Sequence, residues 1–277
     1  MPPGAALLKR IEAMTVRGRE RQWSHIPPDL ARRVRPRVVR IGDGLVTLME
    51  KSDSLRVNRV VGLGHRGEAT ERMIDEIIEI FRTAKLRRFR LELGPGPQSA
   101  AITRWLGRRG FVRRGGYSLL VRDLSRPVPR ATKGVRVVRA RGAALEAALE
   151  IFAEIFATPA SRRGWTLAAA RSGDVEYFLA SAGAAPAGAG ALIAEDGLAW
   201  LVGGATLTKW RRHGTHAALI DARLRRAARL GCRWAWCETS EPAPGRPGIS
   251  RRNMLRMGFV ETCIKPCFVW NAPAGSR

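Results

Sequence analysis

The segment KWRRHGTHAALI, residues 209–220, places a cluster of bases directly before an apolar run with helical spacing. A helix N-terminus presents unpaired N–H groups and a partial positive charge, and a preceding glycine lets an anion come close to the backbone. Arginine side chains add charge-assisted hydrogen bonds to such an anion. The pattern predicts a diphosphate site; the alternative is a solvated basic turn with an ordinary N-cap. The residues of the turn are Arg211, Arg212, His213, Gly214 and Thr215.

The elements around this turn follow the order expected of a mixed α/β sandwich. Apolar residues recur at helical spacing over residues 142–156, and β-branched residues indicate a strand over 135–140. Between residues 175 and 207 the sequence predicts three strands, with turns near Ala185–Pro186 and Asp196–Gly197. The expected order of the second half is β, α, α, β, β, β, α, β, α, β.

Four landmarks recur at offsets of 146 to 148 residues inside matching orders of elements, which indicates an internal duplication. They are Gly67 and Gly214, Asp75 and Asp221, Glu92 and Glu238, and Phe111 and Phe259. The segment DLSRPVPRATKGVR, residues 123–136, has the prolines, polar residues and glycine of a linker. We therefore expect one domain over 1–124, a linker over 125–134 and a second domain over 135–277.

The order of elements and two segments, ATLTKWRRHGTHAALIDARLRRAARLGC and SRRNMLRMGF, resemble the GCN5-related N-acetyltransferase (GNAT) family. The acetyl-CoA signature of that family is Arg or Gln, two residues, Gly, one residue, then Gly or Ala, between strand 4 and helix 3. Arg211, Gly214 and His216 stand at these places, His216 where the usual residue is small. The resemblance covers residues 135–270, and the first half is similar to a degenerate copy. It implies an α/β fold of two tandem GNAT-like mixed-sheet sandwiches.

The resemblance also implies an N-acetyltransferase that uses acetyl-CoA as co-substrate and acylates the amine of a small-molecule acceptor. In the family the pantetheine arm pairs with strand 4 where strands 4 and 5 separate, which corresponds to Gly204, Ala205 and Thr206 here. Asn253 matches a position that often bonds the same arm. The expected cofactor-binding residues are Gly204, Ala205, Thr206, Arg211, Arg212, His213, Gly214, Thr215, His216 and Asn253.

Acyl transfer from a thioester to an amine needs a group that removes a proton from the amine. Glu238, at the end of the strand CRWAWCE, is the candidate base, and Glu195 is a weaker one. The alternative for Glu238 is a structural pairing with arginine. Many GNAT members place a proton-donating tyrosine where this chain has Met254. A non-catalytic acyl-CoA-binding protein therefore stays an alternative.

In the first half, the turn that matches the predicted diphosphate site is GLGHRGEATERMIDE. Its Glu68 and Glu71 fall in the first helical turn, where carboxylates stabilise the helix but repel phosphate. We therefore expect that the first half does not bind CoA and acts as a structural or substrate-shaping partner.

The formal net charge is +25, which raises the possibility of a polyanionic partner. Bases are scattered through both halves, so a nucleic acid is not the favoured partner, although an RNA- or ribosome-associated factor stays an alternative. The cysteine spacings do not fit common zinc patterns, and we expect no metal site. No apolar stretch approaches the roughly 20 residues that span a bilayer, and Lys9, Arg10 and Glu12 lie too close to the first apolar run for a secretory signal. These features predict a cytoplasmic protein, and they leave its oligomeric state open.

Overall fold

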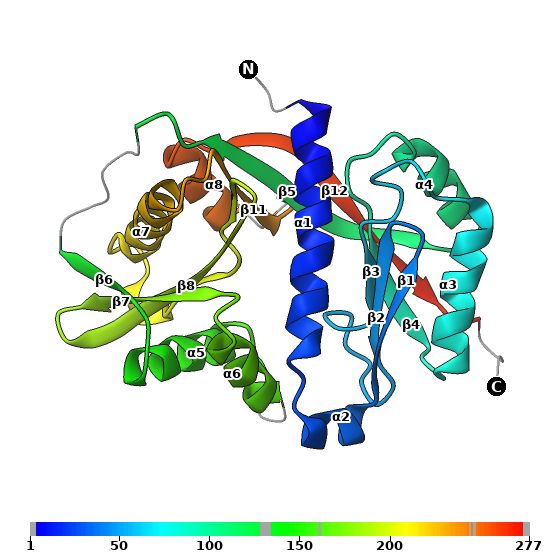
Figure 1. Cartoon of the computed structure of the whole chain (residues 1–277), viewed down its shortest axis with the longest axis horizontal. Coiled ribbons are helices and arrows are strands. Elements are labelled where there is room, and N and C mark those ends of the chain that lie inside the picture. The colour runs from blue at the N-terminus through cyan, green and yellow to red at the C-terminus, as the bar shows by residue number, and fades with distance from the viewer. Residues whose placement is uncertain (1–3, 128–133, 160–161, 244, 246–247, 274–277) are drawn as a thin grey trace. The chain divides into compact units, whose positions relative to one another are not determined.

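A computed structural model describes residues 4–127, 134–159, 162–243, 245 and 248–273 of the chain (Figure 1). The chain forms two compact units. Unit 1 comprises Met1–Ser24, Pro28–Ser118 and Cys263–Arg277, and unit 2 comprises His25–Pro27 and Leu119–Thr262. Most of the predicted linker, residues 128–133, lies outside the described residues.

Two long strands belong partly to each unit. The domains predicted over 1–124 and 135–277 did not anticipate that strands would be shared in this way. Strand β5 (Val112–Asp123) passes from unit 1 to unit 2 after Ser118, and β12 (Val260–Asn271) passes from unit 2 to unit 1 after Thr262. Each of these strands is 12 residues long, and the two are neighbours in the order of strands. Strand β5, the last strand of the first half, therefore ends in unit 2, and β12, the last described strand of the second half, ends in unit 1.

Unit 2 has a mixed sheet in which the end of β5 is followed by β11, β9, β8, β7 and β6, while β10 pairs with β8. The pairs from β6 to β9 are antiparallel, and β9 and β11 are parallel. The strands are β6 (Val135–Arg139), β7 (Glu176–Ala182), β8 (Ala185–Glu195), β9 (Leu198–Trp200), β10 (Gly204–Thr206) and β11 (Trp234–Ser240). The helices are α5 (Ala143–Ile155), α6 (Arg163–Arg171), α7 (Thr215–Arg229) and α8 (Ile249–Arg256).

The order of elements predicted for the second half agrees with the structure except at the third strand expected between residues 175 and 207, which is divided into β9 and β10. Helix α7 begins at Thr215 as expected. One turn was placed wrongly. The chain turns between β7 and β8 at residues 183–184 rather than at Ala185–Pro186, because Gly183 supplies the left-handed backbone (φ +59°) that this turn needs.

Helices cover both faces of the sheet of unit 2, with α5 and α6 on one side of β7 and β8 and α7 on the other (Figure 1). The alternation of side chains along β8 explains this arrangement, because successive residues point to opposite faces. Ala189 and Ala191 pack in the cluster with Phe152 of α5, whereas Leu192 packs in the cluster with Leu219 of α7.

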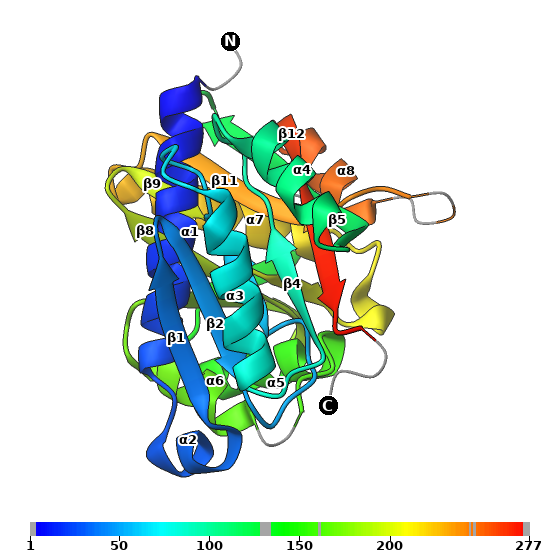
Figure 2. The ribbon, with the colours of Figure 1, turned by 90° about the vertical axis from the view of Figure 1, so that its right-hand side faces the viewer.

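Unit 1 has a sheet in which the end of β12 follows β1, β2, β3 and β4. Its strands are β1 (Pro36–Ile41), β2 (Gly44–Met49), β3 (Arg59–Val61) and β4 (Arg88–Glu92). Its helices are α1 (Ala5–Ser24), α2 (Pro28–Val34), α3 (Glu71–Thr83) and α4 (Ser99–Arg108), and α3 lies along β2 and β4 (Figure 2).

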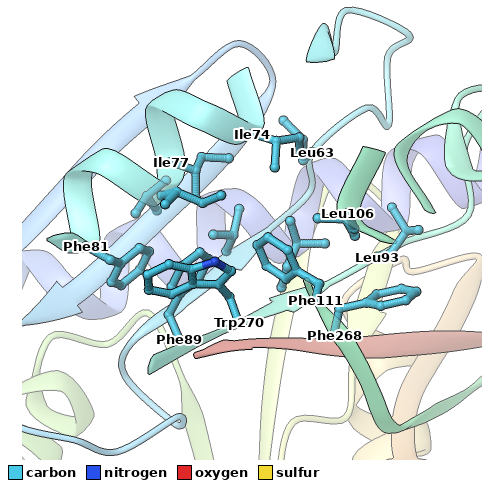
Figure 3. Close-up of a cluster of buried hydrophobic side chains, with 14 of the residues drawn as sticks. Leu63, Ile74, Ile77, Phe81, Phe89, Leu93, Leu106, Phe111, Phe268 and Trp270 are labelled. Atoms are coloured by element: carbon cyan, nitrogen blue, oxygen red, sulfur yellow. The ribbon is translucent and has the colours of Figure 1, made fainter. Parts of the chain in front are cut away.

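The core of unit 1 contains aromatic side chains from distant parts of the sequence (Figure 3). Phe81 of α3 stacks on Phe89 of β4 with the ring centroids 3.9 Å apart, and Trp270 of β12 lies 5.5 Å from Phe89. Phe268 of β12 joins the same cluster. The C-terminal strand therefore completes the core of the unit that begins at the N-terminus.

Buried ion pairs occupy another part of unit 1. Glu12 of α1 lies 2.6 Å from the Lys265 ammonium, and the Glu92 carboxylate pairs with Arg59 at 3.1 Å and Arg90 at 2.6 Å. Burial opposes ionisation of Glu92, but the two guanidinium groups outweigh it and lower its pKa to about 2.

None of the described helices is long and apolar enough to cross a membrane. The described residues include no cluster of three or more metal-ligating side chains.

Replacing Glu92 by Gln should destabilise the chain by about 3–5 kcal/mol, because Arg59 and Arg90 lose their buried counter-charge. The folded-state pKa of Glu92 lies below the ordinary value of a glutamate, so its contribution to stability is present above that ordinary value and is lost as the pH falls toward 2. Urea unfolding between pH 7 and pH 3 measures both effects. The slope of stability against pH should flatten in Glu92→Gln and stay as in the wild type in Glu68→Gln, an exposed carboxylate. Equal slopes in the two variants would contradict this role of Glu92.

Candidate functional site

A break in one strand of unit 2 opens the sheet. Strand β9 pairs in parallel with β11 as far as Trp200 and Trp236, and the Leu201 N–H donates to the Trp236 carbonyl at 2.9 Å. Gly203 then adopts a left-handed backbone (φ +67°), and the next residues, β10, pair with β8. The chain after the break therefore separates from the second half of β11.

The buried side chain of Arg223 on α7 holds this break in place. It is fully buried, and its Nη1 donates to the carbonyls of Gly203 at 2.7 Å and Ala191 at 3.2 Å. A Cβ on Gly190 would lie 2.9 Å from the guanidinium carbon, so this glycine makes room for the arginine. Burial lowers the pKa of Arg223 to about 10, which still leaves it charged at neutral pH. The role of Arg223 was not predicted from the sequence, although an arginine on the apolar face of a helix was a usable signal.

Strand β10 offers one open backbone edge. Gly204, Ala205 and Thr206 pair with residues 188–190 of β8, and no strand in the described part of the chain pairs with the other edge. Ala205 is buried in the cluster with α5, while a Cβ on Gly204 would point toward α7. The three residues predicted to pair with an amide ligand thus lie on an edge that can do so.

The basic turn lies between β10 and α7. Arg212 (φ +68°) and Gly214 (φ +77°) both have left-handed backbones, and Gly214 is the N-cap of α7. No side chain that the structure describes caps this helix, so its first N–H groups stay available. Arg211 and Arg212 are exposed and form no ion pair with any residue that the structure describes. This arrangement can hold an anion.

Two predicted ligands in the turn bond to the turn itself. The Nδ1–H of His213 donates to the Arg211 carbonyl at 2.8 Å, and its ring lies edge-on to Trp210. The Thr215 hydroxyl donates to the Trp210 carbonyl at 3.2 Å and does not cap the helix. The hydroxyl proton of Thr215 is therefore committed to the turn, and the backbone N–H groups are what the turn offers to a ligand.

His216 and Asn253, predicted from separate segments, lie in contact. The Nδ2 of Asn253 on α8 is 3.0 Å from the Nδ1 of His216 on α7. Burial, together with the charge of Arg223, lowers the pKa of His216 to about 4. Met254, next to Asn253, packs into the apolar cluster under α7, so it offers no proton to the site.

The two candidate bases lie at different ends of the sheet. Glu238 is half-buried and lies two residues beyond Trp236, the last residue of β11 that pairs with β9. It is therefore beside the opening. Glu195 pairs with Leu198 at the opposite end of β9, so the fold does not bring it to the opening. The prediction of Glu195 as a second base is not supported, because sequence spacing did not show which end of β8 faces the break.

The corresponding turn of unit 1 is closed by the chain itself. Asp43 accepts the N–H of Gly64 at 2.7 Å and of Arg66 at 2.6 Å, and Gln98 accepts that of Ala69 at 2.8 Å. Strand β3 ends before this turn, at Val61, without a counterpart of β10 in the residues described. A carboxylate of the protein thus occupies the backbone N–H groups of this turn.

In unit 1 the carboxylate of Glu71 is less able to repel a phosphate than its position in the sequence suggested. Its carboxylate pairs with Arg108 at 2.6 Å and Arg109 at 2.7 Å, and hydrogen bonds from these two arginines lower its pKa. Its charge is therefore largely offset, and the occupation of the turn by Asp43 gives a stronger reason to expect no phosphate there.

Several solved structures match the fold of this chain over most of their length. A GCN5-related N-acetyltransferase from Kribbella flavida is 20% identical with a TM-score of 0.64, and the match covers 96% of each chain. A tandem GNAT protein from the clavulanic acid biosynthesis pathway is 15% identical with a TM-score of 0.64 over 85% of this chain and 80% of that one. The chain has the GNAT fold. A GCN5-related N-acetyltransferase from Sphaerobacter thermophilus is 16% identical with a TM-score of 0.61, over 97% of this chain and 92% of that one.

The predicted fold class, two tandem GNAT-like mixed-sheet sandwiches, is confirmed by these matches. No family model and no curated protein sequence matches the chain. In the GNAT fold, β9 with β10 corresponds to strand 4, β11 to strand 5 and α7 to helix 3. The break after β9 therefore lies at the place where strands 4 and 5 of the fold separate.

Replacing Asp43 by Ala should destabilise unit 1 by about 1–3 kcal/mol for each backbone N–H left without its acceptor. Thermal unfolding measures the loss. Added sulfate should raise the melting temperature of Asp43→Ala more than that of the wild type, since an anion can replace the carboxylate. Asp53→Ala, at an exposed aspartate, is the control. An unchanged melting temperature in Asp43→Ala would show that the turn does not depend on this carboxylate.

Proposed function

We propose that unit 2 binds acetyl-CoA and transfers its acetyl group to the amine of a small-molecule acceptor. The observation that supports this most directly is the combination of an open backbone edge on β10 with an uncapped helix start at Gly214. The edge suits the amides of a pantetheine arm, and the helix start suits a diphosphate. Arg211 and Arg212 flank that helix start and supply positive charge.

The reaction follows from these positions. The lone pair of a neutral amine forms a C–N bond to the thioester carbon, and the carbonyl electron pair moves onto oxygen. When the carbonyl re-forms, the C–S bond breaks and its electron pair leaves on sulfur. One proton passes from nitrogen to a base, and the thiolate takes a proton from water. Burial raises the pKa of Cys237 to about 12, so this thiol stays protonated, and direct attack by the amine is favoured over an acyl-cysteine.

Glu238 is the group we propose to accept the proton of the amine, directly or through water. It is half-buried and lies beside the opening between β10 and β11. Met254 gives no proton donor at the position where many family members have tyrosine, which is why water protonates the thiolate in this scheme. Unit 1 does not bind CoA in this proposal and serves as a structural partner.

Charge reversal at the turn tests cofactor binding. Saturating acetyl-CoA should raise the melting temperature of the wild type by several degrees, because a ligand at about 100 times its Kd stabilises by about 2.7 kcal/mol. Arg211→Glu should lose most of this shift by repelling the diphosphate. Arg66→Glu, at the corresponding turn of unit 1, should keep it. A full shift in Arg211→Glu, or its loss in Arg66→Glu, would place the ligand elsewhere.

Replacement of Glu238 by Gln tests proton transfer. Release of CoA thiol from acetyl-CoA should be followed with a panel of small amines, at pH 7. We expect kcat to fall by about 10²–10⁴ with little change in the KM for acetyl-CoA, since the base acts only in the chemical step. Glu195→Gln, at the far end of β9, should retain wild-type kcat. Acetyl-CoA binding without thiol release by the wild type would favour the non-catalytic acyl-CoA-binding alternative.

A further inference from the structure

Two side chains of α7 converge on the start of β10. A Cβ on Gly204 would lie 3.3 Å from the Nε2 of His216 and 3.6 Å from the Nη2 of Arg223. Because Gly204 has no side chain, both nitrogen atoms face the backbone of β10 just after the break. All of these groups lie within unit 2.

The hydrogen bond from Asn253 fixes which nitrogen of His216 bears the proton. The Asn253 amide nitrogen donates to Nδ1 at 3.0 Å, so Nδ1 is the acceptor and Nε2 bears the hydrogen. The pKa of about 4 keeps this imidazole neutral at physiological pH. His216 therefore presents a neutral Nε2–H donor toward Gly204.

Both donors lack an acceptor among the residues that the structure describes. The Nη2 of Arg223 is buried without a hydrogen-bond partner, and the hydrogen bond of His216 to Asn253 involves only its Nδ1. The other hydrogen bonds of Arg223 go to the backbone carbonyls of Leu219, Ala191 and Gly203. A full positive charge is thus buried next to β10 with neutral partners only, which favours the approach of an oxygen that becomes negative.

We propose that His216 and Arg223 donate hydrogen bonds to the carbonyl oxygen of the acyl group and stabilise the oxyanion formed when the amine attacks. The proposal rests on the proposed function and supplies two side-chain donors to the reacting carbonyl, beside the backbone edge of β10 that we assign to the pantetheine arm. The oxygen gains the carbonyl electron pair on attack and returns it when the C–S bond breaks, so no proton moves through His216. The exposed Arg211 and Arg212 serve the diphosphate, whereas this buried pair serves the reacting carbonyl.

A spectroscopic measurement detects hydrogen bonds to the carbonyl oxygen of acetyl-CoA and does not need the acceptor amine. Acetyl-CoA labelled with ¹³C at the carbonyl is bound to the full chain, and its ¹³C resonance and C=O stretch are measured. In the wild type we expect a downfield resonance and a lowered stretching frequency relative to acetyl-CoA in water. His216→Phe, which keeps a ring but removes the donor, should lose much of both shifts, and His216→Gln, which restores an N–H, should recover part of them.

Kinetics provides the second measurement. His216→Phe should lower kcat by about 10²–10³, the usual effect of one oxyanion donor, with little change in the KM for acetyl-CoA. Arg223→Met should show a similar or larger loss, and the matched control Arg225→Met, on the exposed side of α7, should not. If His216→Phe binds acetyl-CoA with the wild-type carbonyl signals and kcat, the proposal is overturned. Failure of the wild type to bind acetyl-CoA would instead overturn the proposed function.

Discussion

The hydrogen bonds from Arg223 to the carbonyls of Gly203 and Ala191 fix the point at which β9 stops and β10 begins. Without this donor, the carbonyls of Gly203 and Ala191 would each lose a hydrogen bond from a charged group, which typically contributes about 1.5–3 kcal/mol. The separation of β10 from β11 follows from this point, and so do the open edge of β10 and the direction in which the chain enters the basic turn. One buried guanidinium therefore determines the local geometry of the candidate site.

The two units use the same kind of turn in opposite ways. In unit 1 a carboxylate of the protein, Asp43, accepts the backbone N–H groups of the turn. In unit 2 the N-cap is a glycine, and among the described residues no side chain accepts the first N–H groups of α7. Two units of the same fold can thus retain their architecture while one satisfies the polar groups of this turn with its own side chain and the other does not.

Local patterns in the sequence predicted much of unit 2, because helical spacing and glycine turns are short-range signals. The order of its elements, apart from the division into β9 and β10, and the start of α7 at Thr215 were obtained in this way. The contact between His216 and Asn253 could not be predicted from local patterns, because it joins residues that are 37 positions apart on different helices. Arg223 was missed because a buried arginine contradicts the apolar pattern of its helix. Helix α1 was not predicted, because polar residues such as Glu12 and Thr15 lie on its buried face.

The position of β12 bears on how the protein folds during synthesis. Phe268 and Trp270, near the C-terminus, fill space in a core formed mostly by residues 46–111. A nascent chain would expose that unfilled apolar surface until β12 had been synthesised, which is a state open to misassembly. Unit 1 therefore depends on a strand that is synthesised long after the rest of its core, and separate expression of the two halves would leave each one lacking a strand that it uses.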